Sequence, residues 1–222
     1  FPYECESDGY KVVYFPRILR STEFNISPAM AGYLKRSIAD YDIVHMHSWR
    51  QFQDMVVHHY AAKRGTPYVL QAHGSIPRIV AKKGEKWFYD MLFGYRVLRD
   101  ASKLISLNST ESEQYANMGV PKEKIEVVPN GINLAEYGKL PPKGSFKKKY
   151  SIDPQEKIVL YLGRMHETKG LHLLAEAFSL AAQNIGSIRL VIVGPDDGYA
   201  DALLELSSKL GIRDRVLLTG FV

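Results

Sequence analysis

Apolar and polar positions along the chain fall into two alternating patterns. Short runs of β-branched and other apolar residues, typical of buried strands, are followed by longer stretches in which apolar residues recur at helical spacing. This alternation predicts an α/β fold in which parallel strands are joined by crossover helices. Strands are expected at residues 11–15, 42–46, 68–71, 103–107, 125–128, 158–162, 190–193 and 216–218, and helices at 29–39, 52–64, 86–99, 109–118, 171–185 and 200–210.

A break in this pattern at residues 138–149 divides the chain. Two adjacent prolines, a glycine and three consecutive lysines interrupt the alternation there, and it restarts with the strand at 158–162. We therefore predict an N-terminal domain at residues 1–145 and a C-terminal domain at residues 146–222. The second domain has too few expected strands for a covered parallel sheet, and the first begins in a loop. Both domains are accordingly expected to be truncated in this chain.

Composition excludes several classes of protein. No apolar run is long enough to cross a bilayer, and the single cysteine, Cys5, cannot form an internal disulfide. The first residues lack the basic and apolar regions of a signal peptide, so a cytoplasmic protein is expected. The net charge is +5, and the basic excess lies before residue 150. A basic surface attracts anionic lipid, nucleic acid or an anionic substrate, and charge alone leaves the three open.

The turn between the strand at 158–162 and the helix at 171–185 carries the most chemical information. Gly163 allows a ligand to approach the backbone closely, and Arg164 and Lys169 can neutralise two negative charges. The free amides and the positive dipole end at a helix start also attract phosphate. The glycine spacing matches neither a dinucleotide-binding fingerprint nor a P-loop. From spacing alone, an anion site and two ordinary solvated charges explain the segment equally well.

Several motifs in order carry a family resemblance. They are residues 128–133 (Val-Pro-Asn-Gly-Ile-Asn), Gly163-Arg164 through Lys169-Gly170, and residues 190–194 (Leu-Val-Ile-Val-Gly). Together they resemble the signature order of family 4 retaining glycosyltransferases of the GT-B fold, and the resemblance extends over nearly the whole chain. It implies two Rossmann-like domains that face each other, a nucleoside diphosphate sugar as donor, and no metal or other cofactor.

The resemblance also implies roles for individual residues. In this family, residues matching Arg164 and Lys169 bind the donor diphosphate, and backbone near Gly194 and Phe221 binds the base. The implied donor-binding residues are Gly163, Arg164, Lys169, Gly194, Phe221 and Val222. Two family features do not occur in the chain: a glycine-rich loop after the first strand, and a Glu-x7-Glu motif late in the second domain. We therefore expect the chain by itself to be inactive.

In the first domain, polar residues follow two of the expected strands. His73 comes after the strand at 68–71, and ligands of open α/β sheets bind at the carboxyl ends of strands. A neutral imidazole there serves equally well to satisfy a backbone carbonyl. In similar enzymes the histidine after this strand contacts the donor sugar near the reacting carbon, so the resemblance implies a role for His73 in transfer. Asn108 and Ser109 follow the next strand and either face the cleft or cap the helix at 109–118.

Histidine and aspartate pairs are the candidate metal ligands of the sequence. His45 and His47 lie two apart on one strand, but no three-ligand spacing such as H-E-x-x-H is present. Asp196 and Asp197 form a carboxylate pair, which is better explained as a cap for the helix at 200–210. No metal site is therefore expected.

Basic and large apolar residues are interleaved at residues 82–93. Packing against the sheet is the stronger explanation for this segment. The alternative is a helix that lies on a membrane surface, which would suit a peripheral enzyme with a lipid-linked acceptor at the inner face of the membrane.

The function that follows is transfer of a hexosyl unit from a nucleoside diphosphate sugar to an acceptor hydroxyl, with retention of configuration and without a metal. The expected partners are the nucleotide sugar and a glycan or lipid-linked acceptor, and no nucleic acid. Two rivals stay open: a nucleotide-sugar epimerase or glycan phosphorylase on the same architecture, and a non-catalytic binding module. The sequence does not specify the nucleotide base, the sugar, the acceptor, the linkage or the oligomeric state.

Overall fold

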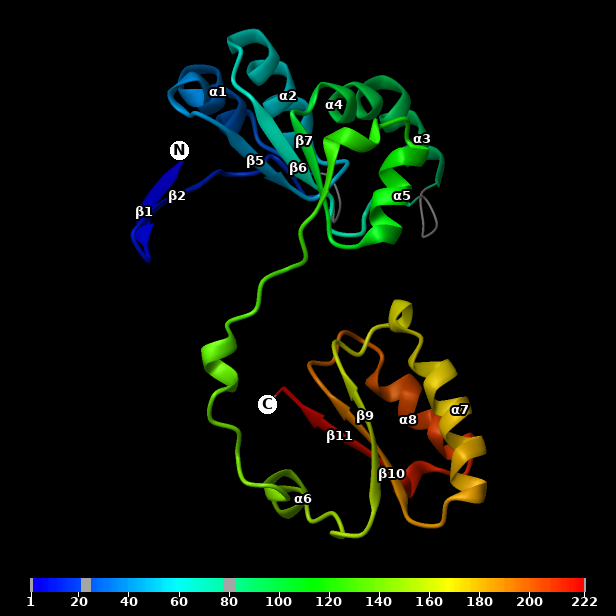
Figure 1. Ribbon diagram of the computed structural model, residues 1–222. Helices are drawn as coiled ribbons and strands as arrows, with labels where there is room; N and C mark the ends of the chain where they lie inside the picture. The colour runs from blue at the N-terminus through cyan, green and yellow to red at the C-terminus, as the bar shows by residue number, and fades with distance from the viewer. Residues whose placement is uncertain (1, 21–24, 78–82, 222) are drawn as a thin grey trace. The chain divides into compact units, whose positions relative to one another are not determined.

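The computed structural model of the chain describes residues 2–20, 25–77 and 83–221 (Figure 1). Its contacts divide the chain into two compact units, Phe1–Ile132 and Asn133–Val222, so the division falls before the boundary predicted at residue 145. Each unit contains a parallel sheet with helices packed against it. The predicted α/β class with two parallel-sheet domains is thereby confirmed.

The first unit opens with an antiparallel hairpin formed by β1 (Tyr3–Ser7) and β2 (Tyr10–Tyr14). Asp8 and Gly9 connect the two strands with φ angles of 52° and 79°, the left-handed backbone that favours a tight hairpin turn. The prediction that the chain begins in a loop is therefore wrong, and the strand expected at 11–15 belongs to this hairpin instead of the parallel sheet. Two short strands, β3 (Leu19–Arg20) and β4 (Asn25–Ile26), form a second antiparallel pair.

The parallel sheet of the first unit has its strands in chain order. They are β5 (Val44–His47), β6 (Tyr68–Gln71), β7 (Lys103–Ser106) and β8 (Ile125–Val127). In this register His47 lies opposite Gln71, so the residues that follow β5 and β6 emerge at the same edge of the sheet. The predicted strands at these positions are confirmed within a few residues.

Helices connect these strands and bury the core of the first unit. They are α1 (Pro28–Ser37), α2 (Phe52–Arg64), α3 (Lys83–Tyr89), α4 (Tyr95–Asp100) and α5 (Ser109–Asn117), with 3-10 turns at Ile38–Asp40 and Lys122–Lys124. Leu70, Leu104 and Tyr115 are fully buried at the centre of this core. Capping residues mark the helix ends: the Ser27 side chain accepts the Met30 amide at the start of α1, and Gly65 ends α2 with a φ of 74°.

The helix predicted at 86–99 is helical throughout but changes from α-helix to π-helix in its middle. A π-helical turn, Asp90–Gly94, separates α3 from α4. Asp90 is fully buried and forms a two-point ion pair with Arg50, at 2.9 Å for each nitrogen-oxygen contact. A Cβ on Gly94 would come within 2.8 Å of the Asp90 carboxylate, so glycine provides the room for this pair.

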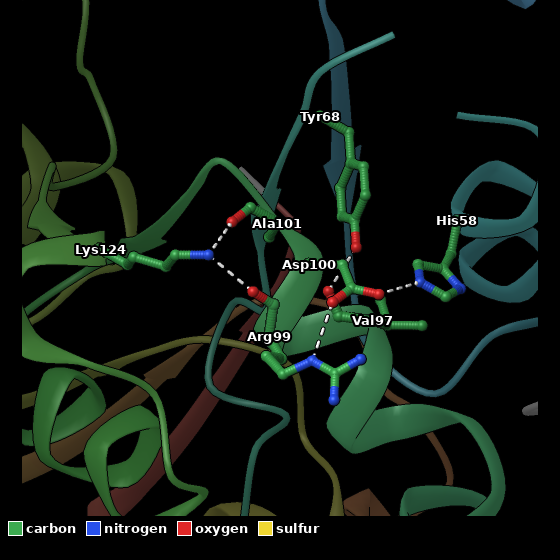
Figure 2. Close-up of polar contacts among 7 residues, drawn as sticks. All are labelled: His58, Tyr68, Val97, Arg99, Asp100, Ala101 and Lys124. Atoms are coloured by element: carbon green, nitrogen blue, oxygen red, sulfur yellow. Dashed lines mark hydrogen bonds and ion pairs between the residues drawn. The ribbon is translucent and has the colours of Figure 1, made fainter. Parts of the chain in front are cut away.

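The end of α4 is held in place by side chains from β6, from α2 and from the 3-10 turn Lys122–Lys124 (Figure 2). The Tyr68 hydroxyl donates to the Val97 carbonyl at 2.5 Å, and His58 lies 2.9 Å from Asp100. Lys124 donates to the last free carbonyls of the helix, at Arg99 and Ala101. These contacts make α4 a fixed part of the first unit.

The second unit has a three-stranded parallel sheet in the order β11-β10-β9. The strands are β9 (Lys157–Leu162), β10 (Ile188–Val193) and β11 (Val216–Gly220). Helices α7 (Leu171–Asn184) and α8 (Ala200–Lys209) pack on one face, and α6 (Ser145–Lys149) lies on the other, as Figure 1 shows. Further 3-10 turns lie at Leu134–Tyr137, Glu167–Lys169 and Arg213–Arg215.

Candidate functional site

Three glycines lie at the carboxyl ends of the three strands of the second unit. Gly163 follows β9, Gly194 follows β10 and Gly220 ends β11. Backbone hydrogen bonds join them in register: the Gly163 amide donates to Val193 and the Gly194 amide to Gly220, both at 2.9 Å. A Cβ on Gly194 would collide with the Gly163 carbonyl oxygen, and the φ of Gly194 is 138°. This edge is therefore bare backbone that a ligand can approach closely.

Arg164 lies directly after this edge and is exposed. Its guanidinium forms an ion pair of 2.5 Å with Asp197, which follows β10, and the Tyr161 hydroxyl donates to its backbone carbonyl. Asp196, the neighbour of Asp197, accepts the amides of residues 198–200 at 2.9–3.0 Å, and these amides lower the pKa of Asp196. The predicted capping role is confirmed for Asp196, but for Asp197 it is wrong because its carboxylate reaches across to Arg164. Arg164 and Asp197 follow β9 and β10, which are adjacent parallel strands. The sequence signal for their contact was therefore that each comes directly after a strand of the same sheet.

Lys169 and Gly170 lead into α7. Lys169 is exposed at the end of a 3-10 turn, and Gly170 follows with a φ of 69°. The first hydrogen bond of α7 runs from the Leu174 amide to the Gly170 carbonyl, so the amides of residues 171–173 point out of the helix start without a helical partner. Gly170 has no side chain with which to cap them. A cation and three free amides thus share one helix terminus.

The remaining donor-binding predictions lie close by or outside the described residues. Phe221 follows β11 and is 85% exposed. Val222 lies outside the described residues, as does Lys82 of the predicted segment at 82–93. The second unit therefore collects Gly163, Arg164 and Gly194 at one edge of its sheet, with Lys169 at the start of the helix that follows β9.

His73 of the first unit occupies a tight turn after β6. The φ angles of His73 and Gly74 are 51° and 77°, and the Ser75 amide returns to the Ala72 carbonyl at 3.2 Å, which together form a type I′ turn. The side chain of His73 is exposed. Its Nε2 lies 2.8 Å from Nδ1 of His47, and the two rings stack at 5.1 Å between centroids.

The contact between His73 and His47 was not predicted, because in the sequence His73 is a lone histidine after a strand. His47 ends β5, the strand beside β6, so the position of both residues at neighbouring strand ends was the available signal. His45 stacks on His47 with centroids 4.2 Å apart. Burial, together with the imidazoles of His47 and His73, lowers the pKa of His45. Among the described residues, no group of three or more His, Cys, Asp or Glu side chains is arranged to hold a metal ion.

Asn108 and Ser109 serve the start of α5. The Asn108 carbonyl oxygen accepts the Glu111 amide at 2.9 Å, and Ser109 is the first helical residue. The capping explanation offered by the sequence is therefore confirmed for Asn108. The turn after β7 lies beside the turn of His73, because β6 and β7 are neighbours in the sheet.

The fold and these side chains define a two-domain α/β protein with a helix start of the anion-binding type. A model of Glycosyltransferase Family 4 matches residues 2–136, and a model of Glycosyl transferases group 1 matches residues 142–222. The chain therefore belongs to glycosyltransferase family 4, with the GT-B fold.

Individual relatives agree with this assignment. The D-inositol 3-phosphate glycosyltransferase of Nocardia farcinica is 27% identical over 194 residues, which are 79% of this chain and 41% of that protein. The UDP-Gal:alpha-D-GlcNAc-diphosphoundecaprenol alpha-1,3-galactosyltransferase of Escherichia coli is 25% identical over 222 residues, which are 96% of this chain and 56% of that protein. The crystal structure of Anabaena HepE in complex with UDP has a TM-score of 0.72 at 18% identity, covering 87% of this chain and 52% of that one. The chain thus spans about half the length of the proteins it matches.

Proposed function

We propose that the protein transfers a hexosyl unit from a nucleoside diphosphate sugar to an acceptor hydroxyl, with retention of configuration and without a bound metal. One observation carries this proposal: Arg164, Lys169 and the open amides of α7 lie on one strand-turn-helix segment, which begins at the bare glycine edge of the sheet. Family membership supports the transferase class, and the bound UDP of HepE supports a nucleotide-sugar donor.

The cations have their largest effect on the leaving group. As the glycosidic bond breaks, negative charge builds on the diphosphate, and donors that stabilise this charge most in the transition state accelerate the reaction. Arg164, Lys169 and the amides of residues 171–173 are these donors. An oxygen of the departing phosphate accepts the proton of the acceptor hydroxyl, which attacks from the face that the diphosphate leaves.

A donor diphosphate must displace Asp197 in order to bind Arg164. The Asp197 carboxylate already occupies the guanidinium of Arg164, and the side chains of the pair are 62% and 44% exposed. An ion pair this exposed is worth at most about 1 kcal/mol, so a diphosphate can displace Asp197 at small cost. The guanidinium of Arg164 is therefore available to the donor.

Binding of the nucleotide is tested by thermal shift. We expect one of UDP, GDP and ADP, tested with the corresponding glucose conjugates, to raise the melting temperature of the full-length protein, because a ligand that binds only the native state stabilises it. At about one hundred times its Kd, the stabilisation is about 2.7 kcal/mol. A screen in which none of the three nucleotides raises the melting temperature would contradict the proposed donor site.

The variant His73→Ala distinguishes a contact with the donor sugar from a contact with the nucleotide. Because we assign His73 to the donor sugar, this variant is expected to lower turnover about tenfold or more while the thermal shift given by the free nucleoside diphosphate is kept. Turnover is measured as nucleotide release. Loss of nucleotide binding in His73→Ala would place the residue in another role, and formation of an epimerised nucleotide sugar without acceptor would favour an epimerase instead.

We further propose that the protein acts in the cytoplasm at the inner face of a membrane, on a lipid-linked acceptor. The name of the Escherichia coli relative includes such a lipid diphosphate. In the helical segment 83–100, Val97 and Leu98 are buried, but six large apolar side chains are each 41–55% exposed. They are Trp87, Phe88, Met91, Leu92, Phe93 and Tyr95. Core packing, the stronger explanation from sequence, does not account for them, and Lys83 and Arg96 add positive charge. No described helix is long and apolar enough to span a membrane.

Vesicle flotation tests the membrane proposal. We expect binding to vesicles of equal parts phosphatidylcholine and phosphatidylglycerol, and about tenfold weaker binding for Phe88→Ser, because burial of one phenylalanine contributes roughly 1.5–3 kcal/mol. The matched control is Leu180→Ser, an exposed apolar residue of α7 that is 64% exposed. Equal loss in both variants, or no binding by the parent protein, would contradict the proposal.

A further inference from the structure

The turn that carries His73 holds a side chain in an unfavourable backbone conformation. A φ of 51° is uncommon for a residue with a Cβ, and it persists only where the surroundings hold it. The contacts that hold this turn therefore decide where the imidazole of His73 lies. Two of them come from α5, a helix that contains none of the proposed donor-binding residues, and Arg50 adds two more by donating to the Ser75 and Ile76 carbonyls.

Glu111 makes the central contact. It is 3% exposed, and its two carboxylate oxygens accept two backbone amides: Gly74 at 2.6 Å and Leu107 at 2.7 Å. These amides belong to the turns after β6 and β7, so one buried carboxylate joins the ends of two neighbouring strands. Charge-assisted hydrogen bonds from amides to a carboxylate are shorter than neutral ones, and both of these are short. Asn108, by capping the Glu111 amide, fixes the backbone from which this side chain extends.

Tyr115 supports the other side of the same turn. It lies one helical turn after Glu111 and is fully buried. Its hydroxyl accepts the Ala72 amide at 2.9 Å and donates to the Ile105 carbonyl at 3.3 Å. The residues on both sides of His73 are thus bonded to α5, and His73 itself is left with its side chain free to meet His47.

We propose that Glu111 is a positioning residue: through the Gly74 amide, its carboxylate sets the direction of the His73 imidazole toward His47 and toward the substrate. This proposal rests on the role of His73 in the proposed function. The rival is a purely structural role, in which Glu111 stabilises the start of α5 and has no effect on His73.

The first test observes His73 directly by NMR. In Glu111→Gln the side chain keeps its shape, but an amide has one acceptor oxygen and turns an N–H toward the second backbone amide. Long-range proton-nitrogen spectra of the full-length protein report the tautomer and titration midpoint of each histidine. We expect the His73 signal, assigned by its absence in His73→Ala, to change in Glu111→Gln. It should stay unchanged in Glu113→Gln, an exposed glutamate of the same helix. An unchanged His73 signal in Glu111→Gln would overturn the proposal.

The second test uses kinetics of the full-length protein, with UDP release from UDP-glucose as the readout. Glu111→Gln is expected to lower kcat about tenfold while KM stays within about twofold, since misplacement of a catalytic group slows turnover more than it weakens donor binding. In the His73→Ala background the same change should cause no further loss. Equal loss in both backgrounds would support the structural rival.

The outcomes separate this inference from the proposed function. Full activity of His73→Ala would refute the role of His73 in transfer, whereas an altered His73 signal in Glu111→Gln would still establish the positioning contact. If UDP-glucose is not turned over, the NMR comparison decides. If Glu111→Gln does not fold, Tyr115→Phe removes the hydroxyl at Ala72, and the same change in the His73 signal is expected.

Discussion

Alanine at Arg164 or Lys169 is expected to lower the turnover of the full-length protein at least about tenfold, because each substitution removes a charge-assisted contact of roughly 1.5–3 kcal/mol to the leaving diphosphate. Both side chains are exposed, so stability should hardly change while kcat/KM falls. The thermal shift produced by the free nucleotide should shrink in parallel. Nucleotide release and melting temperature measure the two effects separately.

Two controls separate a contact with the donor from a loss of surface charge. Arg213→Ala removes an exposed arginine of the same unit and should leave turnover unchanged. Asp197→Asn breaks the ion pair with Arg164 but keeps the arginine, so it should retain turnover and bind the nucleotide at least as tightly. Full activity of both alanine variants, or an equal loss in Asp197→Asn, would refute the assigned role of the cations.

Gly194→Ala is expected to destabilise the second unit by about 3 kcal/mol or more. The added methyl would meet the Gly163 carbonyl oxygen, and the φ of 138° is one that residues with a Cβ rarely adopt. The obstacle is backbone, and Gly163 cannot retreat without loss of its own hydrogen bond to Val193. We expect the melting temperature to fall by roughly 6–12 °C, measured by circular dichroism.

The same variant should also lose the nucleotide-induced thermal shift, because a displaced Gly163 closes the bare edge beside Arg164. Gly186→Ala is the matched control: it has a conformation open to other residues, and its Cβ would meet nothing within 4 Å. A Gly194→Ala protein that melts within about 2 °C of the parent would show that the glycine edge tolerates a side chain.

The elements of the fold could be predicted because their signals are local. The spacing of apolar positions within a short stretch of sequence predicts both strands, such as residues 188–193, and helices, such as residues 171–184. The opening hairpin was missed although Asp8-Gly9 is a strong turn signal, because the strand before it, Tyr3–Ser7, has little apolar character. The widening at Asp90–Gly94 could not be predicted, since it depends on Arg50, which is 40 residues away along the chain.

The sequence by itself determined the α/β class, the two domains and the strand-to-helix segment from Gly163 to Gly170, because these depend on residues close together in the chain. It also determined the family, because several such motifs follow one another in the family's order. Only the tertiary structure decided which side chains meet at the ends of the strands. Arg164 pairs with Asp197 across 33 residues, His73 with His47 across 26, and Gly74 with Glu111 across 37. Each pairing depends on which strands lie side by side and in which register, and these are set by packing of the whole sheet, which no local pattern encodes.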